Sequence, residues 1–406
     1  MSNKVFGFYS FIIIYLCFTV LSPDRLGFNT TISGWIMNFL FLSLIYNCRK
    51  TLYSFFKGEY KTINIITLCY CLWMIFATYM NQKGSHADWY YNLLDDENIN
   101  LKISSVKDVF WKAMRLLSII LFIETCNYKQ RANQFLRISF YTLLIYVIYI
   151  DIYTILGYDR NIYGGKFIIS YLNLYLAVIY YRLYPTLKGK SLFIFLLLLC
   201  LTSYVGLYMK CSTIIVSLIP FVLLILWRLM KKNVLWLYKP SVFLITLLIC
   251  DGILFLFSSW ILSFDFIESF IVDVLNEDMT LTGRLGIYDT IGEVFYDSPY
   301  YGMGVGNYMG VAMVLTGCAN AQNGLINLFL EVGIIGCILF VWWLILLIRK
   351  ARNYSNVSYP IIIFIYAEFL VSMIEIPFSY IHFLIVSSFL LLYDKKSILT
   401  SKNKPL

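Results

Sequence analysis

Lys112 and Arg115 are two basic residues that lie three positions apart in an otherwise apolar stretch of the chain. Residues with this spacing share one face of a helix, and two like charges there repel each other unless an anion or carboxylates lie between them. In one interpretation, the two cations bind a phosphate group. In the other, Lys112 extends toward water. Arg115 then pairs with Asp151 or Glu375.

Lys210 is a third candidate cation, in the short turn 209–213 between two apolar stretches. Lysines are common at the ends of membrane helices, where they extend to the membrane surface. The alternative is a cation that binds an anionic ligand, assisted by the free N–H groups at the start of the next helix. Both interpretations stay open from the sequence.

The segment 281–336 contains the densest pattern of polar residues, turn formers and glycines. Residues 284–296 are compatible with a short amphipathic helix, and Arg284 lies near its N-terminus. Pro299 is a turn signal. The run Gly302-x-Gly304-x-Gly306 follows, but no strand precedes it, so it does not indicate a nucleotide-binding fold.

The end of this segment enters an apolar stretch. Gln322-Asn323 is expected to cap the helix that begins there. Glu331 lies inside the apolar stretch, where a glutamate needs a partner or a proton. Gly333 and Gly336 are expected to let another helix approach closely.

The elements that position these residues follow from composition, since 60% of the 406 residues are hydrophobic and only 14% are charged. Globular domains carry about a quarter charged residues. The composition therefore excludes an ordinary soluble protein, a disordered chain and a nucleic-acid binder, and predicts an all-α polytopic membrane protein. About 20 mostly apolar residues are needed for one span. Twelve stretches qualify: 5–22, 32–48, 62–80, 108–126, 137–156, 167–184, 191–208, 212–229, 241–262, 323–348, 358–374 and 380–394.

Orientation follows from the basic residues in short loops, which concentrate on the cytoplasmic side. A cytoplasmic N-terminus places 22 of the 32 Lys and Arg residues in inner loops and tails. Both termini are then cytoplasmic, and the net charge of +9 mostly reflects this bias. Lys4 precedes the first stretch and no small-residue cleavage site follows it, so we expect a retained helix.

The long connections lie on the predicted outer face, within a single integral membrane domain over residues 1–406. A smaller outer loop covers 81–107, and a large one covers 263–322, between spans 9 and 10. Loops of this length usually bind something or move. We therefore expect the active site on the extracytoplasmic side, in the large loop.

The cysteines and histidines give no sign of a metal site. The chain has ten cysteines but no CxxC motif, and His86 and His382 are far apart in sequence. Most of the cysteines lie in or beside spans, where cysteine behaves as a small apolar residue. We expect neither a bound metal nor a cofactor.

The segment 281–336 resembles the O-antigen polymerase and ligase superfamily, whose members build bacterial surface polysaccharides. The family pattern has Gly-Arg-x-x-x-Trp in a large outer loop, then Pro-x-x-Gly-x-Gly, then His-Asn-x-x-Leu at the head of the next span, which ends in Gly-Ile-Ile-Gly. The resemblance covers about 60 residues, and the span plan extends it loosely to the whole chain. The matching positions are Gly283-Arg284, Tyr288 in place of Trp, Pro299, Gly302, Gly304, Asn323, Ile326 or Leu328, and Gly333 to Gly336.

Two positions depart from the family pattern. Gln322 stands where the family has histidine, a hallmark of the ligases that transfer polymer to lipid A core. Lys210 stands where many members have arginine. The first departure favours a polymerase over a ligase.

The resemblance implies a GT-C-like glycosyltransferase architecture and a glycosyl transfer that polymerises undecaprenyl-pyrophosphate-linked repeat units at the outer leaflet of the bacterial cytoplasmic membrane. The product would be an O-antigen, capsule or exopolysaccharide. Cations must stabilise the departing pyrophosphate. The implied site consists of Arg284, Lys210, Arg115 and Lys112 as cations, Asp289 and Glu293 as candidate bases, and Tyr288, Gln322 and Asn323 as sugar-binding residues.

We expect this transfer to be independent of metal, because Arg and Lys can replace a divalent ion at a pyrophosphate. The expected partners are the lipid-linked oligosaccharide, as donor and acceptor, the bilayer, and a chain-length regulator and flippase of the same pathway. A ligase and a lipid-linked oligosaccharide flippase remain alternatives. A flippase is expected to have two similar halves, which this chain lacks.

Overall fold

The computed structural model describes residues 3–18, 30–83, 106–157, 165–230, 233–253, 298–306 and 321–393. This part of the chain is all-helical and contains no β-strand. The helices are α1 (Asn3–Phe18), α2 (Thr30–Lys57), α3 (Lys61–Lys83), α5 (Val106–Tyr128), α6 (Ala132–Ile155), α7 (Gly165–Leu183), α8 (Lys190–Tyr208), α9 (Ser212–Leu229), α10 (Pro240–Leu247), α15 (Gly324–Ala351), α16 (Ser355–Val371) and α17 (Ile381–Ser388).

Short segments extend some of these helices. A π-helical turn, Leu248–Ile253, continues α10, and 3-10 turns at Pro377–Ser379 and Phe389–Leu391 flank α17. Each of the twelve apolar stretches predicted from the sequence overlaps a helix of the structure. The all-helical class is therefore confirmed for the described residues, while the twelve-span topology stays a prediction.

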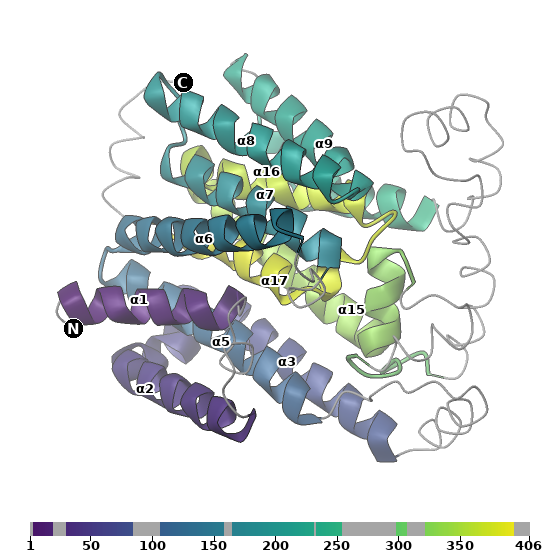
Figure 1. Ribbon diagram of the computed structural model, residues 1–406. Coiled ribbons are helices and arrows are strands. Elements are labelled where there is room, and N and C mark those ends of the chain that lie inside the picture. The colour runs from purple at the N-terminus through teal and green to yellow at the C-terminus, as the bar shows by residue number, and fades with distance from the viewer. Residues whose placement is uncertain are drawn as a thin grey trace.

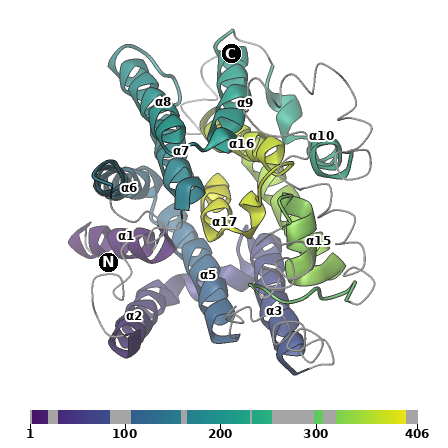
Figure 2. The ribbon, with the colours of Figure 1, turned by 45° about the vertical axis from the view of Figure 1, so that its right-hand side comes forward.

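The helices form one bundle in which α17 is central (Figures 1 and 2). Helix α17 contacts α1, α5, α15 and α16, and its residues are buried. Around it, α15 packs on α3, α3 on α5, and α5 on α2. On the other side, α1 packs on α6, α6 on α7, and α7 on α8 and α16. The elements that surround α17 therefore come from both ends of the chain.

The outward faces of the bundle are apolar. Helix α2 exposes Trp35, Phe39, Leu42 and Tyr46, which lie along one helical face. Helix α8 exposes Phe193 and similar residues. A soluble monomer rarely exposes contiguous apolar surfaces of this kind. Such apolar faces suit helices that cross a membrane.

Five helical stretches among the described residues are long and apolar enough to cross a membrane: Lys61–Asn81, Ala132–Ile155, Lys190–Tyr208, Ser212–Leu229 and Gly324–Val371. The last of these contains both α15 and α16. Shorter apolar helices lie at Pro240–Gly252 and Ile381–Leu391. The chain thus has the helices of a membrane protein.

Candidate functional site

Helix α15 is broken in its first half at Gly333, which has φ 64° and ψ −173°. The segment 298–306, here called the docked loop, lies against this break. In the family resemblance, the docked loop carries the Pro-x-x-Gly-x-Gly element and α15 carries the Gly-Ile-Ile-Gly element. The two elements thus form one structural unit.

Backbone hydrogen bonds join the docked loop to the break. The Ile334 N–H donates to the Pro299 carbonyl at 2.9 Å, and the Met303 N–H donates to the Leu330 carbonyl at 2.6 Å. Backbone groups inside a membrane protein must find partners within the protein. The docked loop supplies them where the helix cannot.

Glycine is required on both sides of this contact. A Cβ atom on Gly302 would lie 2.6 Å from the Leu330 carbonyl oxygen, and one on Gly333 would lie 2.3 Å from the Tyr300 carbonyl. Both residues also have a positive φ, which other residue types adopt only with strain. The sequence led us to expect that Gly333 would admit another helix, whereas the structure shows that it admits the docked loop.

Helix α3 holds the docked loop from its other side. Asn81 donates from Nδ2 to the Gly302 carbonyl at 3.0 Å, and the Thr78 hydroxyl oxygen accepts from the Val305 N–H at 3.1 Å. Trp73 donates from Nε1 to the Val332 carbonyl at 2.8 Å, beside the break. Sequence reasoning did not identify these α3 residues, because their polar side chains are unremarkable without the loop that they bind.

A buried polar stripe runs along the first half of α15. It consists of Asn323, Asn327 and Glu331, which lie four residues apart and are at most 2% exposed. Asn323 caps the helix, because its side-chain oxygen accepts from the Leu325 and Ile326 N–H groups at 3.1 and 3.0 Å. The predicted capping role of Asn323 is confirmed.

Ser379 links the polar stripe to helix α5. Asn327 donates from Nδ2 to the Ser379 hydroxyl at 2.7 Å, and Lys112 Nζ donates to the Ser379 carbonyl at 2.9 Å. The same ammonium lies 3.7 Å from Glu331 Oε2. Glu331 therefore has its partner, and Lys112 interacts within the bundle.

Asp251 approaches the start of the polar stripe from the π-helical turn after α10. It is 1% exposed and accepts a 3.0 Å hydrogen bond from the Ser372 hydroxyl. The Ser372 carbonyl in turn accepts from the Gly324 N–H at 2.7 Å. Asp251 was missed from the sequence, although a carboxylate inside a predicted span is itself a functional signal.

Two buried atoms at this position have no hydrogen-bond partner among the described residues: Asp251 Oδ1 and Asn323 Nδ2. Such atoms are uncommon in folded proteins and call for an explanation, such as a bound polar group. One is an acceptor and the other a donor. Together with the polar stripe and the Asp251 carboxylate, they make the start of α15 our candidate site.

The remaining predicted site residues lie on several different elements or outside the described residues. Lys210 lies in the turn between α8 and α9, where its carbonyl accepts from Lys166 Nζ at 3.3 Å. Arg115 lies on α5, one turn beyond Lys112. Gln322 directly precedes the Asn323 cap and has φ 48°. Arg284, Tyr288, Asp289 and Glu293, and with them the predicted 284–296 helix, lie outside the described residues.

Within the described ranges, no group of three or more His, Cys, Asp or Glu residues is arranged to hold a metal ion. Eight cysteines in these ranges are free thiols: Cys48, Cys69, Cys71, Cys126, Cys200, Cys211, Cys250 and Cys337. The local chemistry of the site thus consists of one ion pair, amide and hydroxyl groups, and the Asp251 carboxylate.

Comparison with known proteins gives no family assignment. No family model matches the sequence, and neither a curated protein nor a solved structure matches it.

Proposed function

We propose that this protein is a membrane glycosyltransferase that polymerises undecaprenyl-pyrophosphate-linked oligosaccharide repeat units into a surface polysaccharide, at the outer leaflet of a bacterial cytoplasmic membrane. One observation carries the proposal. The docked loop and the start of α15, which hold two separate elements of the polymerase and ligase pattern, fold into one unit. Its glycines and Asn323 have specific structural roles there.

In the proposed reaction, a hydroxyl of one lipid-linked unit attacks the anomeric carbon of another. The bond between that carbon and the pyrophosphate oxygen breaks, and the hydroxyl proton passes to a carboxylate. Arg284, Lys210 and Arg115 stabilise the negative charge of the departing pyrophosphate. Asp289 and Glu293 are the candidate bases, and Tyr288 and Gln322 contact sugar rings and hydroxyls.

We assign the residues at the start of α15 to the binding of a sugar hydroxyl in this reaction. Asn323 Nδ2 and Asp251 Oδ1 supply a donor and an acceptor for a sugar hydroxyl. Lys112 is paired with Glu331, so its role is to join α5 to α15 and hold the site in place. We therefore assign pyrophosphate binding to the other cations.

The test uses purified protein, a synthetic lipid-pyrophosphate repeat unit and a chelator, with the products separated on a gel. A ladder of products supports a metal-independent polymerase. Arg284→Ala should abolish the ladder while the protein still inserts and unfolds at the wild-type temperature. Transport of the substrate across a vesicle bilayer without any ladder would instead favour a flippase.

A further inference from the structure

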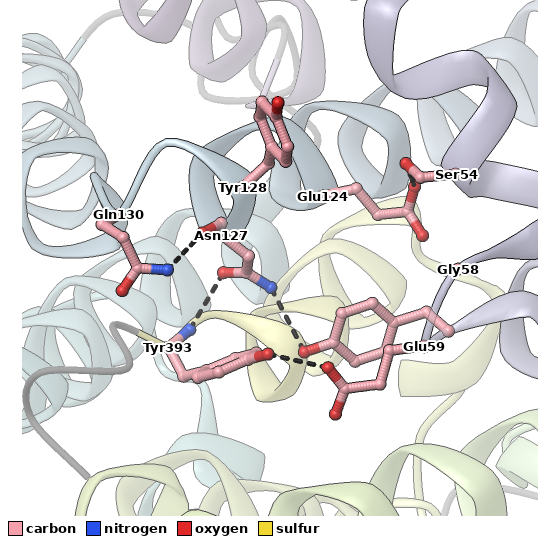
Figure 3. A pocket seen from close by; sticks show the side chains of 9 residues that line it. Ser54, Gly58, Glu59, Glu124, Asn127, Tyr128, Gln130 and Tyr393 are labelled. Atoms are coloured by element: carbon pink, nitrogen blue, oxygen red, sulfur yellow. Dashed lines mark hydrogen bonds between the residues drawn. The ribbon is translucent and has the colours of Figure 1, made fainter. Parts of the chain in front are cut away.

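A cavity of about 310 Å³ lies at the opposite end of α5 from Lys112. It lies between the turn that joins α2 to α3, the end of α5, and the end of the described C-terminal segment (Figure 3). Its lining includes the carboxylates of Glu59 and Glu124 and the rings of Tyr60, Tyr128 and Tyr393. No lysine or arginine lines it.

The two carboxylates differ in their surroundings. Glu59 pairs with Lys350 and accepts a hydrogen bond from the Tyr393 hydroxyl at 3.0 Å. Glu124 is 6% exposed and accepts from Asn64 Nδ2 at 2.6 Å and from the Ser54 hydroxyl at 3.2 Å. These donors are neutral.

Among the described residues, no basic group lies within ion-pair distance of Glu124. A carboxylate taken out of water is costly unless a positive charge compensates it. Glu124 therefore has the geometry of a counter-charge for a cation that enters the cavity.

The tyrosine walls also suit a cation. The Lys350 ammonium already lies 5.1 Å from the centre of the Tyr60 ring. The Tyr60 and Tyr393 rings lie 6.3 Å apart at 68° to each other, so their faces point in different directions. The face of an aromatic ring attracts ammonium and guanidinium groups.

We propose that this cavity binds an organic cation, a guanidinium or ammonium group, with Glu124 as its counter-charge and the tyrosine rings as its walls. One water molecule needs about 10–15 Å³, so the cavity has room for such a group together with part of its alkyl chain. The cavity lies at the end of the bundle where Lys57, Lys61 and Lys129 are found, which the positive-inside rule predicts to be cytoplasmic. The cation is therefore either a free cytosolic amine or the side chain of a basic peptide. This inference does not rest on the proposed transferase activity.

The experiment measures binding to the full chain in lipid nanodiscs by calorimetry. Agmatine represents the free cation, and the capped tripeptide Gly-Arg-Gly represents a side chain. Binding of agmatine but not of the peptide would identify a free amine as the ligand. Binding of the peptide with an affinity equal to or greater than that of agmatine would identify a basic protein segment. Either result supports the cation site. Absence of binding by both probes would overturn it.

Variants of Glu124 and Tyr128 test whether these residues bind the cation. Glu124→Gln preserves the shape of the side chain, and we expect it to weaken binding about tenfold or more, as for the loss of one charged hydrogen bond. Asp108→Asn, the same change at the other end of α5, is the matched control and should bind as wild type. Tyr128 is exposed, so Tyr128→Leu should fold normally and weaken binding about two- to fivefold. Wild-type affinity in both Glu124→Gln and Tyr128→Leu would refute the proposal.

Discussion

Gly333→Ala should release the docked loop from helix α15. Gly333 has φ 64° and ψ −173°, a backbone conformation found almost only in glycine. A Cβ atom there would lie 2.3 Å from the Tyr300 carbonyl, which is backbone and cannot rotate away. The alanine side chain and the docked loop therefore cannot both keep their positions.

The magnitude follows from two contributions. Forcing alanine into this conformation costs about 1–3 kcal/mol. Undocking the loop would relieve this strain but break the bonds from Ile334 to Pro299 and from Met303 to Leu330, each of which contributes about 0.5–1.5 kcal/mol. The strain of about 1–3 kcal/mol is therefore of the same size as the docking bonds that oppose it, and the overlap with the Tyr300 carbonyl shifts the balance toward the undocked state.

The assay is cysteine labelling. Met303 is 3% exposed, so a Met303→Cys thiol should react slowly with a water-soluble maleimide. In the Gly333→Ala background it should react at least tenfold faster. The Gly333→Ala protein that keeps Met303 shows how much of the labelling comes from the native cysteines.

Gly157→Ala is the matched control. Gly157 also has a positive φ, 80°, but a Cβ atom there meets nothing within 4 Å. This variant should carry only the conformational cost, about 1–2 kcal/mol, and should leave the Met303→Cys labelling rate unchanged. Equal labelling rates in Gly333→Ala and wild type would refute the assignment of Gly333 to loop docking.

Three further predictions concern the polar residues of the site. Lys112→Ala should lower the free energy of unfolding by about 3–5 kcal/mol, because it leaves the buried Glu331 carboxylate without its positive partner. The double variant Lys112→Ala/Glu331→Leu should recover most of this loss in thermal unfolding. A double variant as unstable as Lys112→Ala would contradict the ion pair. Asn323→Asp keeps the capping oxygen but replaces Nδ2 by a second buried carboxylate oxygen near Asp251, so it should lower the unfolding temperature and form product at least tenfold more slowly in the polymer assay. Asn323→Ala should lose about 1 kcal/mol of stability and also form product more slowly. Wild-type turnover in both variants would remove this residue from the substrate site. Lys210→Ala should reduce polymer formation more than Lys210→Arg, because charge is retained in the arginine variant; equal losses on the gel would show that geometry, not charge, matters there.

Helix positions could be predicted from the sequence because the requirement for about 20 apolar residues is local. The stretch 212–229, for example, coincides with α9 at Ser212–Leu229. The stretch 380–394 is less regular than expected, since it contains the short α17 at Ile381–Ser388 and a 3-10 turn. The tight polar turn before it, which includes Ser379, depends on contacts with α5 and α15.

The break in α15 could not be predicted, because it depends on a tertiary contact. Glycine inside an apolar stretch is compatible with a straight membrane helix, a close helix pair or a break. Only the docking of a segment some 30 residues earlier in the sequence selects the break at Gly333. The pairing of Lys112 with Glu331 has the same origin, since the two residues lie on different helices. In contrast, the capping role of Asn323 is local and was predicted correctly.

The broken helix also suggests why a glycosyltransferase would use this arrangement. Asp251 and Pro299 lie on either side of the segment 254–297 in the sequence, and hydrogen bonds fix both residues, Asp251 to Ser372 and Pro299 to Ile334 of α15. In the proposed function, the intervening residues include Arg284, which must meet a pyrophosphate at short range. Misplacement of a catalytic group by about 1 Å can cost 100-fold in rate. Loop docking at Gly333 and the hydrogen bond from Ser372 to Asp251 would then act on catalysis at a distance, by holding fixed the two ends of the chain segment that carries the cation.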